Sequence, residues 1–217
     1  MSTPVVPRRR RQLLLALCAA AVLLVVMVAG ALVSCGGAAT TSTNTQAMST
    51  ALPTDPKALF GSGCGTLPTS ANDPSSPAAM SRETVRDIVT RQPQLSTLYK
   101  AAQKAGMLHA FDHRTGLTVL MPTNAAFDKV PTLQLKFALS NKSLITKILK
   151  YHVIAEPLSP EHLNLDGPFD TLEGSQLHVR GFGERLRLGD QSAHVICGNI
   201  PAKGATVYLI DTVLLPT

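Results

Sequence analysis

The stretch that decides the fold is residues 117–127, which reads LTVLMPTNAAF. Its first five residues are apolar or β-branched, and Pro122 follows, which has no N–H for a sheet ladder; this pattern predicts a short strand that ends there. Thr123 or Asn124 can then accept hydrogen bonds from the free N–H groups of a helical turn. Phe127 faces inward from that turn. The stretch therefore predicts a strand that leads directly into a capped helix.

Helical periodicity lies on both sides of this strand. Before it, apolar residues recur every three or four positions in 81–90, with Ser81 as the expected cap, and in 93–105. After it, the same spacing recurs in 132–139 and 141–150. The first half of the folded region is therefore expected to be mainly helical.

Towards the C-terminus the period changes to two. Apolar and polar residues alternate through residues 177–188, interrupted by a glycine-containing turn at 181–183. Further strands are expected at 151–155, 194–197 and 207–214. Too few residues separate the later strands for helical crossovers, which parallel neighbours would need. We therefore expect an α+β domain with an antiparallel sheet.

The N-terminal end has the pattern of an export signal. Four arginines precede residues 13–33, an uncharged stretch long enough to cross a bilayer as a helix. The stretch ends in Leu-Val-Ser-Cys-Gly at 32–36, which resembles the bacterial lipobox. This resemblance implies that a signal peptide, residues 1–34, is removed and that Cys35 carries lipid. An uncleaved membrane-spanning anchor is the alternative, and either form would tether the domain outside the same membrane.

Charge and composition exclude nucleic acid as a partner. The chain has 217 residues, a net charge of +6 and no Trp. Four of its 20 basic residues precede the apolar stretch, so sixteen basic and 14 acidic residues remain after residue 34. A nucleic-acid binder would carry a basic stripe and aromatic platforms in its folded part.

The cysteines point to one disulfide. Cys18 lies in the apolar stretch and Cys35 is assigned to lipid, which leaves Cys64 and Cys197. In an oxidising compartment we expect these two to form a disulfide that joins an N-terminal arm to a late strand. A metal pair or two reactive thiols is the alternative, but neither cysteine has CxxC or Cys/His spacing.

The exported part divides into a tether and a domain. Residues 35–79 consist largely of Gly, Ala, Ser, Thr and Pro, a composition typical of a flexible tether, with a docking arm near 59–64. The threonine-rich tract at 40–45 suits O-linked sugars or a plain spacer equally. Residues 80–217 are expected to form one domain with one core.

Three blocks in this domain resemble the conserved blocks of fasciclin domains. Residues 118–127 resemble the first block, with Leu-Met where Phe-Ala is usual. A Tyr-His pair follows the Leu- and Ile-rich helix, and residues 207–216, VYLIDTVLLP, resemble the block that ends the domain. The positions that carry this resemblance are Thr118, Pro122, Thr123, Asn124, Phe127, Tyr151, His152 and Asp211.

Together with the lipobox and tether, the blocks are most similar to the cell-surface fasciclin lipoproteins of mycobacteria. The resemblance implies a wedge of β-strands with helices packed along it, and a non-catalytic role in adhesion or recognition. The chain would then be a lipid-anchored membrane protein and secreted antigen on the extracytoplasmic face, with palmitate or a similar acyl group on Cys35. Its partner would be an unidentified surface or host macromolecule. Whether a soluble form leaves the tether stays open.

Each motif residue also has a structural interpretation. We expect His152 to be a hydrogen-bonded imidazole in the core, on a strand beside Tyr151. Asp211 is expected to accept hydrogen bonds from backbone donors at a strand end. Partner contacts are expected instead from exposed loops, for which residues 165–172 and the Gly181 turn are candidates.

Neither a cofactor nor a metal is expected. His109 and His113 have the i, i+4 spacing of metal ligands, but no HExxH motif accompanies them, and a solvated loop explains them. The chain has no GxSxG, Walker or GxGxxG motif. Two alternatives to a recognition module remain: a carrier of a small apolar ligand and, with less support, a metal-assisted hydrolase.

Overall fold

The computed structural model describes residues 58–112, 114–165 and 167–216. These residues all belong to one compact unit, Met48–Thr217. The expected signal peptide, the expected lipid site Cys35 and residues 35–57 of the expected tether lie outside the described residues. Within the described ranges, no helix has both the length and the apolar character to span a bilayer.

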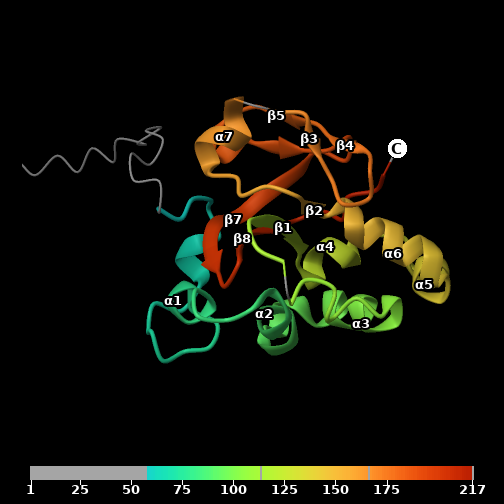
Figure 1. Cartoon of the computed structure of the whole chain (residues 1–217), viewed down its shortest axis with the longest axis horizontal. Coiled ribbons are helices and arrows are strands. Elements are labelled where there is room, and N and C mark those ends of the chain that lie inside the picture. Colours follow the sequence, from blue (N-terminus) through green and yellow to red (C-terminus); the bar gives the residue numbers. More distant parts are fainter. Residues whose placement is uncertain (1–57, 113, 166, 217) are drawn as a thin grey trace, which may run out of the picture. The chain divides into compact units, whose positions relative to one another are not determined.

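A six-stranded sheet forms the centre of the domain, in the order β2-β1-β8-β7-β6-β5 (Figure 1). Its strands are β1 (Leu117–Pro122), β2 (Val153–Ile154), β5 (Val179–Arg180), β6 (Arg187–Leu188), β7 (Ala193–Ala202) and β8 (Ala205–Ile210). A separate pair is formed by β3 (Phe169–Asp170) and β4 (Gln176–Leu177).

One pairing corrects the expected antiparallel sheet. β1 and β8 run parallel, with Thr118 opposite Thr206 and Met121 opposite Leu209, whereas the other pairings of named strands are antiparallel. The connections between the late strands are too short for helical crossovers, but this excludes parallel pairing only between one late strand and another. β1 lies far earlier in the sequence, and the helices between it and β8 provide the connection that a parallel pair needs. The domain is α+β with a mixed sheet.

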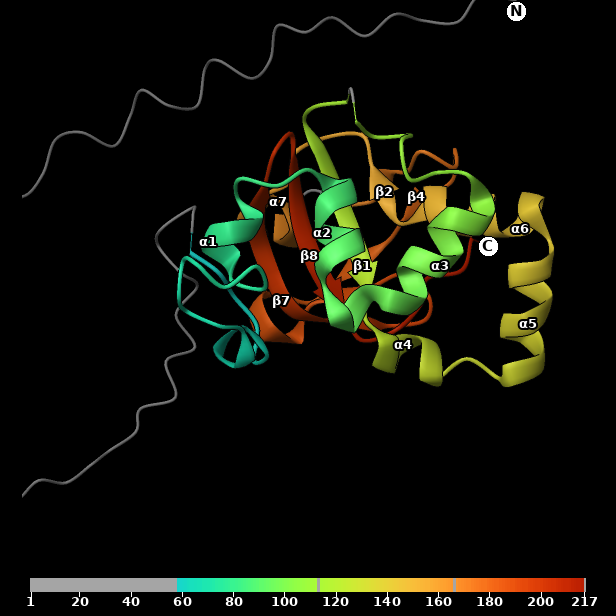
Figure 2. The same ribbon diagram turned by 90° about the horizontal axis from the view of Figure 1, so that it is seen from below.

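Helices cover one face of this sheet. Figure 2 shows α2, α3 and α4 in front of β1 and β8. The α-helices are α1 (Pro77–Met80), α2 (Val85–Arg91), α3 (Ser96–Ala105), α4 (Asn124–Asp128), α5 (Thr132–Ser140), α6 (Lys142–Tyr151) and α7 (Pro160–Leu165). The 3-10 helices are η1 (Cys64–Thr66), η2 (Pro93–Leu95) and η3 (Gly183–Arg185).

The central strands are buried on both faces. On β8, Val207 and Leu209 point into a cluster with the helices, whereas Tyr208 and Ile210 point into a second cluster with α7 and the small hairpins. Every residue of β1 is buried, which explains its continuous apolar sequence. The domain therefore has two packed clusters, one on each side of a shared sheet, where one core was expected.

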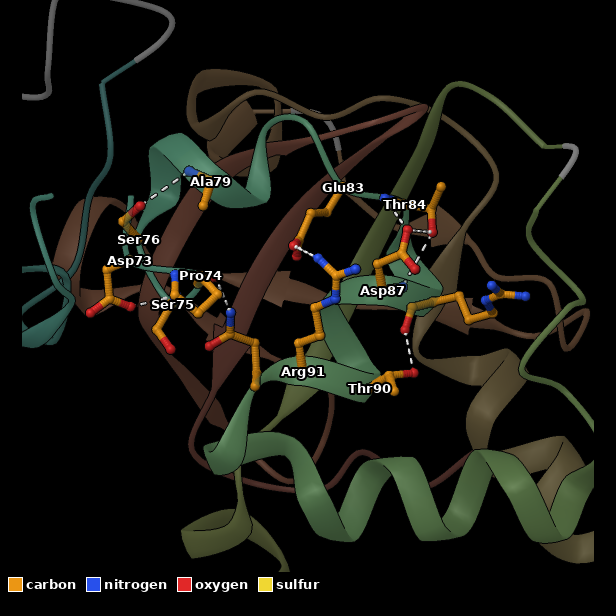
Figure 3. A network of polar contacts seen from close by, with 12 residues as sticks. Asp73, Pro74, Ser75, Ser76, Ala79, Glu83, Thr84, Asp87, Thr90 and Arg91 are labelled. Carbon is orange, nitrogen blue, oxygen red and sulfur yellow. Dashed lines mark hydrogen bonds and ion pairs between the residues drawn. The ribbon is translucent and has the colours of Figure 1, made fainter. Parts of the chain in front are cut away.

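The N-terminal arm is part of the folded body. Phe60 pairs with Gly198 through hydrogen bonds in both directions, and Cys64 is joined to Cys197 of β7 by the expected disulfide. Further along, the Gln92 side chain donates to the Pro74 carbonyl at 2.7 Å, a contact that Figure 3 shows beside α2. The folded part thus begins before the expected boundary at Met80.

The start of α2 also differs from its expectation. Thr84, and not Ser81, is the N-cap: its hydroxyl accepts from the Asp87 N–H, and the Asp87 carboxylate accepts from the Thr84 N–H (Figure 3). This reciprocal pair satisfies two donors that a helix start otherwise leaves free. Arg91, at the other end of α2, donates to Glu83 at 2.6 Å. The helix is thereby fixed at both ends.

Candidate functional site

Thr118, the first motif residue, is a fully buried bridge between two segments. Its hydroxyl donates to the Glu156 carbonyl and accepts from the Leu158 N–H, each at 2.8 Å. These two backbone groups lie in the connection from β2 to α7, which has no ladder to pair them. The hydroxyl therefore holds this connection against β1, which is a structural role.

The next motif residues correct the expected cap. Thr123 occupies the N-cap position of α4, yet its hydroxyl makes no cap hydrogen bond and is buried without a protein partner. Asn124 reaches across to α3 instead: its side-chain oxygen accepts from the Thr97 N–H at 3.0 Å and its amide donates to the Pro93 carbonyl at 3.0 Å. Asn124 thus caps a distant helix and ties it to the end of β1.

This contrast between two threonines yields a matched prediction. Thr118→Val is expected to lower the free energy of unfolding by about 2 kcal/mol, because it leaves two buried backbone groups unpaired. Thr123→Val is expected to change it by less than about 0.5 kcal/mol, since no hydrogen bond is lost. Urea unfolding of both variants checks this. Equal losses in the two would contradict the structural role of the Thr118 hydroxyl.

The Tyr-His pair lies at the junction of α6 and β2, not on one strand as expected. Tyr151 ends α6 and donates its hydroxyl to the Gln176 carbonyl at 3.3 Å, while His152 is the C-cap residue. The expected strand over 151–155 shortens to the two residues of β2. The helical spacing of apolar residues in α6 extends to Tyr151, whose side chain is buried in the core, and the helix therefore continues to this residue.

Both ring nitrogens of His152 are engaged. Nε2 accepts from the Leu214 N–H at 3.0 Å, so the proton of the neutral ring is on Nδ1, which donates to the Ile148 carbonyl at 2.8 Å. Burial lowers the pKa of His152 from 6.5 to about 4, although the bond to Ile148 opposes the shift. The imidazole therefore joins α6 to the C-terminal segment as a neutral core residue.

Asp211 lies just beyond β8 and fills its acceptor sites with local donors. It accepts from the His194 N–H at 2.7 Å, from the Thr212 hydroxyl at 2.9 Å and from Lys129 at 2.8 Å. Burial raises the pKa of Asp211, but these hydrogen bonds outweigh burial and hold the pKa below its usual value. Its contacts fit the structural role that the sequence suggested.

Pro122 and Phe127 complete the motif. Pro122 is the last residue of β1, opposite Ile210, and Phe127 is 4% exposed in the helical cluster. The motif residues are thus distributed over the inside of the domain rather than gathered around a cleft. The cavity that reaches His152 has a volume of only about 50 Å3.

Of the histidine pair, His109 lies among the described residues. His109 is exposed, and its Nδ1 lies 2.9 Å from the Asp112 carboxylate and 3.1 Å from Arg86. His113 lies outside the described residues. Within residues 58–112, 114–165 and 167–216, no group of three or more His, Cys, Asp and Glu side chains is placed to hold a metal ion.

An apolar opening larger than the cavity at His152 lies elsewhere, at a place not expected from the motif residues. We call it the α5 groove: a surface groove of about 510 Å3 bounded by α4, α5, α6 and the C-terminal segment. Its floor consists of the buried side chains Phe127, Ile145, Ile148 and Val213. Its rim is formed by the exposed side chains Leu133, Phe137 and Leu215.

The exposure of this rim is unusual for the domain. Leu133 is 81% exposed, Phe137 63% and Leu215 43%. The other large apolar side chain exposed to this degree in the described part is Phe182, at 55%, near the Gly181 turn named as a candidate surface. A signal for the groove was present in the sequence: α5 carries Leu or Phe on opposite sides, too many for a short helix with one buried face.

Residues 93–216, which contain these motif positions, match the family model of the fasciclin domain. The chain belongs to the fasciclin family. Membership confirms the resemblance in the sequence blocks and the α+β fold class. In this fasciclin domain the first block forms β1 and the start of α4, the Tyr-His pair lies at the junction of α6 and β2, and the last block forms β8 and the C-terminal segment.

Two relatives match most of this fasciclin protein. The immunogenic protein MPT70 of Mycobacterium tuberculosis is 38% identical over 165 residues, 73% of this chain and 82% of MPT70. The cell surface glycolipoprotein MPB83 of Mycobacterium bovis is 38% identical over 179 residues, 78% of each chain. A solved FAS1 domain pair from the insect cell adhesion molecule Fasciclin I is 22% identical, with a TM-score of 0.45 over 56% of this chain and 45% of that one.

Proposed function

We propose that this protein is a non-catalytic recognition module that adheres to other macromolecules at the cell surface. The observation that carries the proposal is the α5 groove with its exposed rim. Monomeric proteins seldom leave large apolar side chains side by side in water, and such patches mark interaction sites. The two clusters on either side of the sheet are packed with buried apolar side chains, and the titratable motif residues His152 and Asp211 are occupied by structural hydrogen bonds.

Lipid on Cys35 is proposed to hold the module at the extracytoplasmic face of the membrane. The lipobox-like sequence supports this, as does the similarity to MPB83, a cell surface glycolipoprotein. One acyl chain gives marginal membrane binding and two or more give stable anchoring. Mass spectrometry of the membrane form is expected to find acylated Cys35 at the N-terminus. An intact sequence from Met1 to Ser34 would contradict this assignment.

The adhesion proposal is tested with beads that carry residues 48–217, the compact unit with both clusters and the disulfide. These beads are expected to adhere to bacterial or host envelope preparations, and Leu133→Ser with Phe137→Ser is expected to abolish most of this adhesion. Phe182→Ser, which removes a similarly exposed ring outside the groove, is the comparison variant: a larger loss of adhesion in it would assign the contact to the Gly181 turn instead. Beads that bind no envelope preparation would overturn the proposed function.

A carrier of a small apolar ligand is the second candidate. A groove of about 510 Å3 with an apolar floor lies in the size range of ligand pockets. A carrier would bind a monomeric fatty acid or similar probe at one site per chain, and that binding would be measured by titration of a fluorescent fatty acid. Failure to saturate at one site would exclude this candidate.

A further inference from the structure

The helical pair α5 and α6 combines the exposed apolar rim with a strongly positive sequence. Between Asp128 and Glu156 the chain contains five lysines and no acidic residue. Lys129 pairs with Asp211, which leaves Lys136, Lys142, Lys147 and Lys150, all exposed. Within the described ranges, these four lysines have no ion-pair partner within 4.0 Å.

These lysines lie on the elements that bound the α5 groove. Lys136 lies on α5, one residue before Phe137 and three after Leu133, so it projects beside the rim. Lys142, Lys147 and Lys150 line a separate surface hollow of about 500 Å3 on α6. Glu173 also lines that hollow, but its single negative charge does not balance the positive charges of the three lysines.

The position of the pair leaves it accessible. Both views show α5 and α6 at the opposite end of the domain from α1 (Figures 1 and 2). The arm and its disulfide pack on β7 at the α1 end, through η1. Docking through α5 and α6 therefore does not obstruct the arm.

We propose that α5 and α6 dock on an anionic lipid bilayer, with Leu133 and Phe137 inserted at the acyl boundary and the lysines against lipid phosphates. The inference rests on the proposed surface function and names the chemistry of the partner. Apolar side chains flanked by lysines are the pattern of an interfacial membrane helix, in which burial and charge attraction add together. Residues on α6 supply part of the charge, so the docking element is the helical pair rather than one helix.

Two other occupants fit these observations less well. A second copy would bring the same lysines together across a two-fold axis, and like charges that face each other oppose association. A small apolar ligand enclosed by the groove would leave the lysines unused, because none of them lines the groove. A broad, negatively charged apolar surface matches both the rim and the lysines.

The test is co-sedimentation of residues 48–217 with vesicles of phosphatidylcholine alone or mixed with phosphatidylglycerol. Wild-type protein is expected to bind the mixed vesicles and to bind pure phosphatidylcholine at least about tenfold more weakly. Added salt is expected to weaken binding to the mixed vesicles, because it screens the lysine charges.

Two double variants separate the apolar and the charge contributions. Leu133→Ser with Phe137→Ser, and Lys136→Glu with Lys147→Glu, are each expected to reduce partition to mixed vesicles about tenfold or more. The controls are Phe182→Ser and the charge-matched pair Arg82→Glu with Arg180→Glu, which should leave partition nearly unchanged. All substituted positions are exposed or half-exposed, so circular dichroism should show an unaltered fold.

Each contrary outcome has a distinct meaning. Absence of binding to mixed vesicles, or an equal loss in the controls, overturns the membrane inference. Sedimentation equilibrium that shows a dimer, dissociated by the Leu133 and Phe137 substitutions, assigns the rim to a second copy and also overturns it. If vesicles fail but beads still adhere to envelopes in a protease-sensitive manner, the membrane inference falls while the proposed adhesion function stands.

Discussion

Replacing Cys64 by Ser and Cys197 by Ala is expected to lower the free energy of unfolding by about 2–5 kcal/mol. The disulfide closes a loop of sequence separation 133, and so restricts the unfolded chain over nearly the whole domain. It also fixes the arm, which is otherwise held by hydrogen bonds to β7 near Phe60 and Gly63 and by the buried Phe60 ring against Tyr208. Guanidinium unfolding of residues 48–217 measures the loss.

Reduction offers an independent control for this prediction. The unit 48–217 contains two cysteines, so a reducing agent acts on this bond alone. Reduced wild-type protein should unfold near the midpoint of the double variant, and the reducing agent should not move the midpoint of the variant. An unchanged midpoint for reduced wild-type protein would show that the disulfide contributes little to stability and would contradict this prediction.

Acidification from pH 7 to pH 4 is expected to reduce the free energy of unfolding by about 3 kcal/mol through His152 alone. The folded-state pKa is about 4, below the usual 6.5, so the unfolded chain binds the extra proton in this window. The stabilisation is complete above pH 6.5 and is lost as the pH falls towards 4. Protonation would place a charge in the core and remove the acceptor for the Leu214 N–H.

The pH profile separates this residue from the carboxylates. Asp211, whose pKa is held below its usual value, loses its contribution at lower pH than His152 does. His152→Gln should be less stable at neutral pH but should lack most of the decline between pH 6.5 and 4. His178→Gln, at an exposed position, should keep it. A decline of the same size in both variants would show that another group titrates.

The elements set by local chemistry were predictable from the sequence. Gly106 ends α3 in the left-handed conformation that glycine adopts readily, and Ser159-Pro160, two residue types that favour a helix start, begins α7. The wrong predictions concerned a helix cap and a strand pairing, in which the structure uses a different hydrogen-bonding partner from the expected one. Thr84 with Asp87 forms a better cap than Ser81, and the parallel register of β1 depends on a strand far along the chain.

The candidate site was harder to predict than the fold. The roles of His152 and Asp211 followed from the cost of burying an unpaired polar group. The α5 groove could not be predicted in this way, because the spacing of apolar residues does not show which of them other elements of the fold cover. Leu133 and Leu135 look alike in the sequence, yet only Leu133 projects fully into solvent.

The parallel pairing of β1 with β8 has a consequence for biosynthesis. The ribosome releases β1 long before β8, and β8 is the strand that lies between β1 and β7. During most of that interval the nascent chain presents β1, an apolar strand whose edge lacks its eventual neighbour β8, a situation that favours aggregation and chaperone capture. The central sheet therefore closes only after residue 210 has been made, and nonsense mutations before codon 205 leave the sheet without β8, the strand that joins β1 to β7.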